Sequence, residues 1–184
     1  MKKSIEKINK KNQWKTLGSK ITYRNPWYHV RTDKVIRPDG QQSQYNMVIM
    51  KGKGVSIIAL DERGNICLVG QNRYTTKKYA WELPTGSAEK QSGLDGAKRE
   101  LLEETGFKAR RWKKIGSFHP MVGISDEIAE VFVATGLFRT ATDKKLEEGI
   151  SAVRFASWAT VRRMIKTGQI TNGQSIAALG FYKL

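Results

Sequence analysis

The sequence predicts a mixed sheet protein of the α/β or α+β class. Three observations indicate this class. Short strand patterns separated by turn residues fill most of the chain, one strongly charged helix pattern interrupts them, and two further helix patterns lie near the C-terminus. Strands mixed with helices in this way are typical of a sheet covered by helices. The periodicity by itself leaves both classes open.

The first strands are expected between residues 14 and 50. In "YHVRTDKVI", strand-forming residues alternate with His29 and Arg31, and the turn signal Pro38-Asp39-Gly40 follows. A strand resumes in "YNMVIM", and two glycines come shortly after it. These signals predict a small β-rich region at the start of the chain.

The next pattern is a pair of apolar runs in "GVSIIALDERGNICLVGQNRY" around a turn at residues 61–65. Such a pair predicts a β-hairpin. The single cysteine, Cys67, lies in the second run and has no disulfide partner within the chain. We expect it to be buried as a small apolar residue, in keeping with a reducing cytoplasm. "YAWELPTG" then adds a strand that ends in the loop Pro84-Thr85-Gly86.

A central helix is expected over residues 94–105, with Gly106 as its stop. Two strands follow, "WKKIGSFHPMVG" and "IAEVFVATGLF", on either side of the loop "VGISDE". A polar loop leads to a further strand, "VRFASW". A helix capped by Ser157 should extend to residue 166, and a last helix should cover residues 174–182.

The chain is strongly basic, with 33 Lys and Arg against 17 Asp and Glu in 184 residues and a formal net charge of +16. Such a surface attracts phosphates on nucleotides or nucleic acid, and it also favours solubility, so a nucleic-acid partner stays open. No apolar run approaches the roughly 20 residues that cross a bilayer, and the N-terminus lacks the apolar core of a signal peptide. We therefore expect a cytoplasmic protein without a membrane partner.

The stretch "KRELLEETGF" gathers three glutamates on the expected central helix. At about 100° per residue, Glu100, Glu103 and Glu104 share an arc of about 100°. Arg99 lies at i,i+4 spacing from Glu103, which suits an ion pair. An apolar stripe runs alongside and consists of Leu94, Ala97 and Leu101. The helix can therefore pack by this stripe and direct its carboxylates at one point.

Three like charges on one arc repel one another unless a cation joins them. Carboxylate oxygens suit Mg²⁺ or Mn²⁺, which are hard ions that keep several waters for phosphates to replace. The alternative is an ordinary solvated helix face. The loop "ELPTG" before the helix favours a metal site, because a strand–loop–helix unit exposes backbone carbonyls beside the carboxylates.

The segment "GSAEKQSGLDGAKRELLEETGF" resembles the Nudix box, whose usual form is G-x5-E-x7-R-E-U-x-E-E-x-G-U with U apolar. The C-terminal half matches at every fixed position, namely Arg99, Glu100, Leu101, Glu103, Glu104, Gly106 and Phe107. Further segments resemble the ADP-ribose pyrophosphatase branch of Nudix hydrolases: "NPWYHVRTDKVIRPDG", "QNRY", "WELPTG", "FHPMVGISDE" and "LEEGISAV". The resemblance extends over nearly the whole chain from about residue 14.

The box departs from the family pattern in its first half. Twelve residues separate Gly86 from Arg99, where the pattern has thirteen. The first glutamate of the box has no counterpart, since Ser92 stands nearest its place, and Glu89 is the only acid in the loop before the helix. This departure concerns the supporting metal ligands, and with them full activity, and it leaves the pair Glu100–Glu104 intact.

The resemblance implies an α/β fold, specifically a Nudix α/β/α sandwich preceded by a small N-terminal β-rich region. The expected divisions are a basic N-terminal tail at 1–13, the N-terminal β region at 14–50 and the Nudix hydrolase domain at 51–184. Relatives of this branch usually form homodimers by exchanging the N-terminal region, so a homodimer is implied here.

The resemblance also implies a metal site. Glu100 and Glu104 would bind Mg²⁺, with Mn²⁺ as the alternative ion, and the Thr85 carbonyl would be a third ligand. Glu103 would either join the metal ligands or orient Arg99. Metal ions in such sites neutralise a diphosphate and activate water for attack on phosphorus.

The general base should come from elsewhere, because carboxylates that bind a metal are poor proton acceptors. In this branch it is often a glutamate on a late loop, where "DKKLEEGIS" offers Glu147 and Glu148; we favour Glu148, against the alternative of a solvated loop acid. Arg73 in "QNRY" matches an arginine that holds substrate phosphates in relatives, and its guanidinium can grip them bidentately. The alternative is a surface strand arginine.

Two further sites follow from the resemblance. Trp27 or Tyr28 would stack on an adenine, although packing in the strand is the alternative for both. Asp126 and Glu127, in "GISDE", match a loop that borders the substrate in relatives. Capping of a local turn is the alternative for this cluster.

The function implied is metal-dependent hydrolysis of a nucleoside diphosphate linked to another moiety. ADP-ribose or a related nucleotide sugar is the favoured substrate, with AMP and a sugar phosphate as products. Two alternatives stay open. One is a pyrophosphohydrolase acting on an RNA 5′ end or a dinucleoside polyphosphate, and the other is a catalytically weakened Nudix domain that binds nucleotide or RNA.

Overall fold

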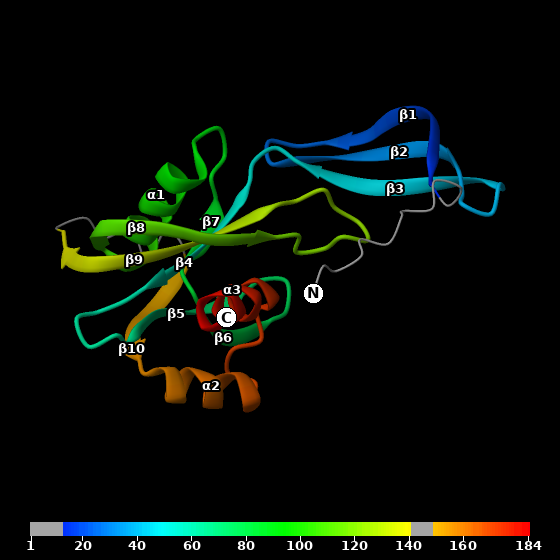
Figure 1. Cartoon of the computed structure of the whole chain (residues 1–184). Helices are drawn as coiled ribbons and strands as arrows, with labels where there is room; N and C mark the ends of the chain where they lie inside the picture. Colours follow the sequence, from blue (N-terminus) through cyan, green and yellow to red (C-terminus); the bar gives the residue numbers. More distant parts are fainter. Residues whose placement is uncertain (1–12, 141–148) are drawn as a thin grey trace, which may run out of the picture. The chain divides into compact units, whose positions relative to one another are not determined.

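The computed structural model describes residues 13–140 and 149–184. In it the chain forms two compact units (Figure 1). The N-terminal unit extends to Lys51 and includes the short segment Gly123–Asp126, and the larger unit contains Gly52–Val122 and Glu127–Leu184. Most of the expected basic tail, and the segment that contains Glu147 and Glu148, lie outside the described residues.

The N-terminal unit is an antiparallel sheet with strand order β1-β2-β3. Its strands are β1 (Lys15–Arg24), β2 (Tyr28–Ile36) and β3 (Gln42–Met50), which confirms the predicted β-rich region. The segment 123–126 lies beside β3, where Ser125 bridges to Val48. This contact between parts of the chain distant in sequence had no signal in the local pattern.

The larger unit contains two sheets, with strand orders β7-β4-β9-β8 and β10-β5-β6. The strands are β4 (Gly54–Ala59), β5 (Ile66–Arg73), β6 (Lys78–Glu82), β7 (Thr85–Ser87), β8 (Phe107–Phe118), β9 (Ala129–Arg139) and β10 (Ile150–Ala156). The helices are α1 (Gly93–Thr105), α2 (Trp158–Lys166) and α3 (Gly173–Lys183), each within one residue of its expected position. Strands β4 and β9 run parallel, whereas the other pairs are antiparallel.

The helices cover opposite sides of these strands (Figure 1). One apolar cluster packs under α1 and includes Val55, Ile57 and Leu101. A second cluster packs under α2 and α3 and includes Ile58 and Leu179. Strand β4 therefore contributes alternate side chains to both clusters, which explains why it is buried along its whole length. The predicted α/β class is confirmed.

The predicted β-hairpin around residues 61–65 is wrong. The turn is present, since the Asp61 carboxylate accepts hydrogen bonds from the backbone N–H groups of Arg63 and Asn65. However, β4 and β5 lie in different sheets, and only an isolated bridge between Leu60 and Ile66 joins the two sides of the turn. Strand β4 pairs with β7 and β9, and β5 pairs with β6 and β10. The two strands thus bury their apolar side chains against other elements and not against each other.

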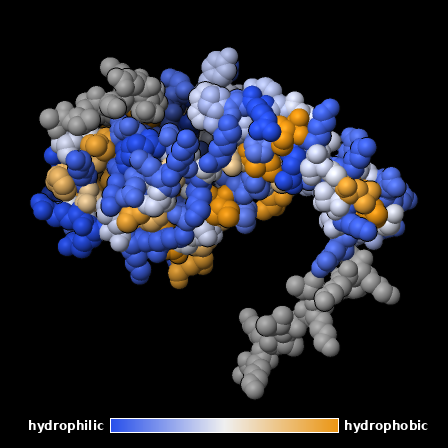
Figure 2. Space-filling model, turned by 90° about the horizontal axis from the view of Figure 1, so that it is seen from above, coloured by the Kyte–Doolittle hydropathy of each residue, from blue (hydrophilic) through white to orange (hydrophobic). Residues whose placement is uncertain are grey.

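The surface of the chain is mixed. Figure 2 shows hydrophobic side chains in separate patches among hydrophilic ones. Strand β1 is exposed at nearly every position. Leu17 and Tyr23 within the strand, and Trp14 just before it, are each about half exposed. None of the helices in the described part of the chain is both long and apolar enough to cross a membrane.

Cys67 is fully buried and free, as expected. Burial, together with the negative charges of Glu104 and Asp61, raises the pKa of its thiol to about 12. Since the thiolate is the reactive form, the native protein should not react with a thiol reagent such as DTNB at pH 8. In denaturant, one thiol per chain should react within minutes. Rapid labelling of the native protein would contradict the buried position.

Gly180 offers a stabilising substitution in α3. It is exposed, and a Cβ added there would meet nothing within 4 Å. Glycine in a helix interior costs about 0.5–1 kcal/mol relative to alanine, so Gly180→Ala should raise the free energy of unfolding by about that amount. Urea unfolding curves of the two proteins test this, and a lower midpoint for the variant would contradict the open surroundings.

Candidate active site

Helix α1 is fixed at both ends and along its apolar stripe. The Ser92 hydroxyl accepts a hydrogen bond from the Asp95 backbone N–H and so caps the N-terminus. At the other end Gly106 adopts the left-handed conformation, with φ 73°. Ala97 and Leu101 are fully buried in the cluster under α1. The predicted stripe therefore faces the strands, which sets the direction of the glutamates.

Glu100 and Glu104 both point at β7 and are buried, with 7% and 5% of their surface exposed. The backbone N–H of Ser87 donates to Glu100 Oε1 at 3.1 Å, and that of Thr85 donates to Glu104 Oε2 at 3.0 Å. A Cβ at Gly86 would lie 2.1–2.3 Å from the carboxyl atoms of Glu100. The missing side chain of Gly86 thus provides the space that the Glu100 carboxylate fills.

Arg99 joins the carboxylates of α1 to the preceding loop. Its guanidinium donates to Glu103 Oε2 at 2.6 Å, to Glu100 Oε1 at 2.8 Å and to the Ser87 carbonyl at 2.6 Å. Glu89, the only acid in the loop, lies 3.9 Å from the same side chain. The i,i+4 ion pair expected between Arg99 and Glu103 is present, and the role of Glu103 toward a metal stays a prediction.

The carboxylates of Glu100 and Glu104 lie close to each other and are largely buried from solvent. Burial raises the pKa of the Glu100 carboxyl, and Arg99 opposes this effect by its charge and its hydrogen bond, while Glu103 adds to it. A cation placed between the carboxylates would relieve this cost. The Glu100 and Glu104 carboxylates would therefore be stabilised by a bound cation.

The donor set fits a hard divalent ion with few protein ligands. Among the described residues, no group of three or more His, Cys, Asp or Glu side chains is arranged to hold a metal ion. Two buried carboxylates beside the backbone of β7 remain, which suits Mg²⁺ because it is usually held by one or two carboxylates and keeps waters for substrate phosphates. Glu100 and Glu104 would hold the ion, and a contribution from the Thr85 carbonyl stays a prediction.

Arg73 lies at the end of β5, where Glu82 holds it. Its Nε donates to Glu82 Oε1 at 2.9 Å, and Asn172 donates to Glu82 Oε2 at 3.0 Å. The hydrogen bonds that Arg73 donates to the Glu82 carboxylate raise the pKa of Arg73, and the negative charge of Glu104 adds to this. Two of its nitrogens already bind Glu82, so a phosphate would use its remaining N–H groups.

Sequence reasoning did not identify Glu82. Only 1% of its surface is exposed, and it orients the arginine expected to bind phosphate. Its position in "WELPTG" could have indicated it. An acidic residue at the end of an apolar strand is expected to be buried, and a buried carboxylate needs a charged or hydrogen-bonding partner.

The remaining predicted residues are divided between the two units. Trp27, Tyr28 and Asp126 belong to the N-terminal unit, and Glu127 belongs to the larger one. Trp27 is 69% exposed, whereas Tyr28 is half-buried with its ring 6.0 Å from that of Tyr23. The Asp126 carboxylate accepts a hydrogen bond from the Met50 backbone N–H at 3.0 Å. Their roles toward a substrate stay predictions.

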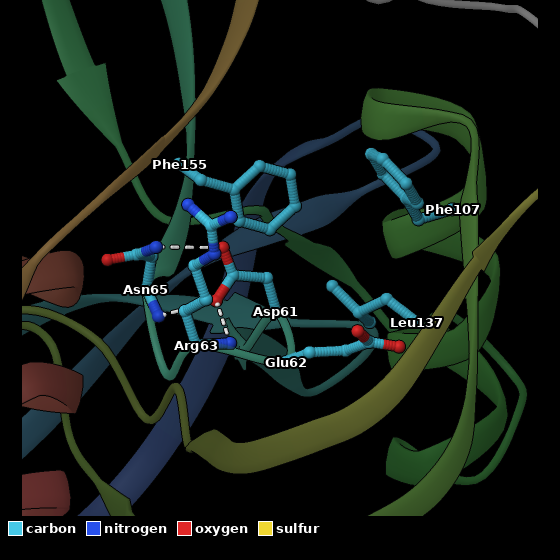
Figure 3. A pocket seen from close by; sticks show the side chains of 7 residues that line it. All are labelled: Asp61, Glu62, Arg63, Asn65, Phe107, Leu137 and Phe155. Carbon is cyan, nitrogen blue, oxygen red and sulfur yellow. Dashed lines mark hydrogen bonds between the residues drawn. The ribbon is translucent and has the colours of Figure 1, made fainter.

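The larger unit also has a hollow of about 430 Å³ (Figure 3). Its lining consists of Asp61, Glu62, Arg63, Asn65, Phe107, Leu137 and Phe155. The Phe107 and Phe155 rings meet edge to face, with centroids 5.6 Å apart. None of the predicted site residues lines this hollow. The Asp61 carboxylate in its lining already accepts hydrogen bonds from the backbone of the turn at residues 61–65 (Figure 3).

Comparison with known families and structures gives a consistent result. Residues 50–179 match the model of the NUDIX domain, which is more than half of the chain. The chain belongs to the Nudix family.

Residues 14–48 match a second model, the nucleoside diphosphate sugar hydrolase N-terminal domain. The resemblance found in the Nudix box is therefore confirmed, and the protein is a Nudix pyrophosphohydrolase with an N-terminal three-stranded sheet. Nudix enzymes generally use a divalent metal ion.

Three similar proteins illustrate the range of relatives. The ADP-ribose pyrophosphatase of Mycobacterium tuberculosis is 31% identical over 172 residues, which cover 91% of this chain and 82% of the relative. The ADP-ribose pyrophosphatase of Bacillus subtilis is also 31% identical, over 73% of this chain and 72% of the relative. A crystal structure of an ADP compounds hydrolase superposes with a TM-score of 0.80 over 93% of this chain and 92% of that one. At 16% identity, that last similarity shows the fold alone.

Proposed function

We propose that this Nudix pyrophosphohydrolase cleaves a nucleoside diphosphate linked to a sugar, with ADP-ribose as the favoured substrate and AMP and ribose 5-phosphate as products. The observation that carries the proposal is the buried pair Glu100–Glu104 directed at β7. Support for the substrate class comes from the N-terminal match and from the two ADP-ribose pyrophosphatases that are similar over most of the chain.

The described residues supply binding and orientation. A Mg²⁺ ion held by Glu100 and Glu104 would neutralise the diphosphate and increase the acidity of water, with Mn²⁺ as the alternative ion. Arg73, oriented by Glu82, binds the substrate phosphates through its remaining N–H groups. Arg99 holds Glu100 and Glu103 in place, so that the carboxylates keep their geometry as charge develops on phosphorus.

Other parts of the proposal rest on residues away from α1. Glu148, or Glu147 beside it, accepts the proton from the attacking water as the general base. Trp27 or Tyr28 stacks on the adenine, and Asp126 and Glu127 border the substrate. The chain forms a homodimer through the N-terminal unit, and support for this comes from the exposed apolar side chains around β1, such as Trp14 and Leu17.

A product assay tests the proposal. The protein would be incubated with ADP-ribose and Mg²⁺, beside a panel of other nucleotide sugars and a 5′-triphosphate RNA. AMP and ribose 5-phosphate should appear in equal amounts and only when the metal is present. Hydrolysis of another nucleotide sugar alone would keep the reaction and change the substrate. Binding without turnover of any substrate would instead support a weakened domain.

A second candidate function is hydrolysis at an RNA 5′ end, which the basic strand β8 favours. Lys108, Arg110, Arg111 and Lys113 are all exposed there, and none of them forms an ion pair with a described acid. Release of counterions would make RNA affinity fall steeply with salt. A steep decrease in the apparent affinity for RNA between 50 and about 200 mM salt, with little change for ADP-ribose, would favour this candidate.

A further inference from the structure

Glu130 is a buried carboxylate on β9 that none of the assigned roles explains. Only 6% of its surface is exposed, and two lysines bind the same oxygen. The distances to Oε1 are 3.0 Å from Lys53 Nζ and 2.8 Å from Lys114 Nζ. Burial alone would raise the pKa of Glu130, but the hydrogen bonds from Lys114 and Lys53 outweigh it and hold the pKa below its usual value. Glu130 is therefore ionised at neutral pH.

The second oxygen of Glu130 lies against the start of α1. A Cβ added to Gly93, the first residue of the helix, would lie 1.8 Å from Glu130 Oε2. Only glycine leaves room for this approach. The first turn of a helix has unpaired backbone N–H groups and a partial positive charge, so an ionised carboxylate stabilises it there.

The same ion pair reaches the loop before the helix. The Lys53 carbonyl accepts a hydrogen bond from the Ala88 backbone N–H at 2.8 Å. Ala88 in turn packs closely on Gly96, because a Cβ at Gly96 would lie 2.5 Å from Ala88 Cα. Glu130 thus contacts the start of α1 directly, and Lys53 links it to the loop that leads from β7 into the helix.

The position of this carboxylate corresponds to the defect in the Nudix box. Counted forward from Gly86, the missing glutamate would fall at Ser92, and counted back from Arg99 it would fall at Gln91. Neither residue is acidic, and Ser92 is the N-cap. The carboxylate of Glu130 on β9 lies against Gly93, one or two residues after these positions.

We propose that Glu130 is a positioning residue for the metal site, because it fixes the N-terminal end of α1 and thereby the positions of Glu100 and Glu104. Glu100 lies seven residues after Gly93, about two turns or roughly 10 Å along the axis. A small rotation of the helix at Gly93 moves both carboxylates relative to the N–H groups of Thr85 and Ser87. The inference rests on the metal site of the proposed function, and it does not depend on which substrate is cleaved.

The test is the variant Glu130→Gln, which keeps the size of the side chain and removes its charge. Mn²⁺ binding is measured without substrate, from the electron paramagnetic resonance signal of the free ion, beside kcat and KM with ADP-ribose. Residues that support metal ligands typically contribute 10- to 100-fold to affinity or activity, so we expect the Mn²⁺ Kd to rise about 10-fold. The value of kcat should fall by a similar factor, and KM should change less than about two-fold.

Asp33→Asn is the matched control. Asp33 is also a buried carboxylate, 4% exposed and 2.8 Å from Arg31, but it lies in the N-terminal unit. Its replacement should lower the Tm without changing the Mn²⁺ Kd. If Glu130→Gln does not fold, Glu130→Asp takes its place, since it keeps the charge but withdraws it from Gly93, and it should give a smaller rise in the Mn²⁺ Kd.

Two outcomes would overturn the proposal. A Glu130→Gln protein with the wild-type Mn²⁺ Kd and kcat would do so, and so would a lower Tm with an unchanged Mn²⁺ Kd, which would make Glu130 a structural ion pair only. Because Mn²⁺ binding needs no substrate, the result is separate from the substrate assay. A wild type that fails to cleave ADP-ribose, combined with weaker Mn²⁺ binding by the variant, would refute the substrate and retain the role of Glu130.

Discussion

Replacing Glu104 by glutamine should lower kcat for ADP-ribose by about 10³-fold, which corresponds to about 4 kcal/mol of lost transition-state stabilisation. The Glu104 carboxylate is 5% exposed and accepts the Thr85 backbone N–H at 3.0 Å, so glutamine can keep the shape and this one hydrogen bond. It cannot keep the negative charge that a divalent ion needs. Release of AMP, measured by chromatography with saturating ADP-ribose and Mg²⁺, gives the rate.

The same variant separates a functional loss from a folding defect. Glu104 lies one turn from Glu100 and beside Glu103, so removing its charge relieves repulsion in the absence of metal. We therefore expect a Tm no lower than that of the wild type without metal. The increase in Tm that Mg²⁺ gives to the wild type, which follows from binding to the folded state only, should disappear.

Glu62→Gln is the control for the loss of one negative charge, because Glu62 is exposed in the turn at residues 61–65. It should leave both kcat and the effect of Mg²⁺ on Tm unchanged. A Glu104→Gln protein that retained more than a tenth of the wild-type kcat would place the metal away from Glu104 and would contradict the proposed site.

The features that were predicted correctly are those that depend on neighbouring residues. The end of α1 follows from Gly106, which acts on the backbone within one turn of itself. The direction of Glu100 and Glu104 follows from their angle to the buried stripe at Ala97 and Leu101. For these two features of α1, the residues within a few positions of each other are sufficient for the prediction.

The features that were missed depend on partners distant in the chain. Strand β4 pairs with β7 and β9, not with β5 across the short turn, and the energy of those pairings appears only when the whole core forms. The partners of Glu82 and Glu130 follow the same rule. Asn172 is 90 residues after Glu82, and Lys53 is 77 residues before Glu130. A single sequence has no periodic signal for contacts of this length.

Replacing Gly86 by alanine should lower kcat about 10²-fold while the protein stays folded. A Cβ at this position would lie 2.1–2.3 Å from three carboxyl atoms of Glu100, far inside contact distance. These atoms are the end of a flexible side chain, so the carboxylate can swing away. It would then lose its hydrogen bonds from Ser87 and Arg99 at a cost of about 1–2 kcal/mol in the free energy of unfolding. The displaced carboxylate can no longer bind the metal beside Glu104.

Gly96→Ala provides the contrast, because its added Cβ would meet the backbone of Ala88 at 2.5 Å, where no side chain can rotate out of the way. Overpacking of this kind costs about 1–3 kcal/mol, so Gly96→Ala should show the larger decrease in Tm. Gly86→Ala should show the larger decrease in kcat relative to its decrease in Tm, because it displaces the Glu100 carboxylate directly. Thermal unfolding and initial rates at 25 °C on both variants measure this difference. If Gly86→Ala kept the wild-type kcat, the position of the Glu100 carboxylate against β7 would not be the one that catalysis requires.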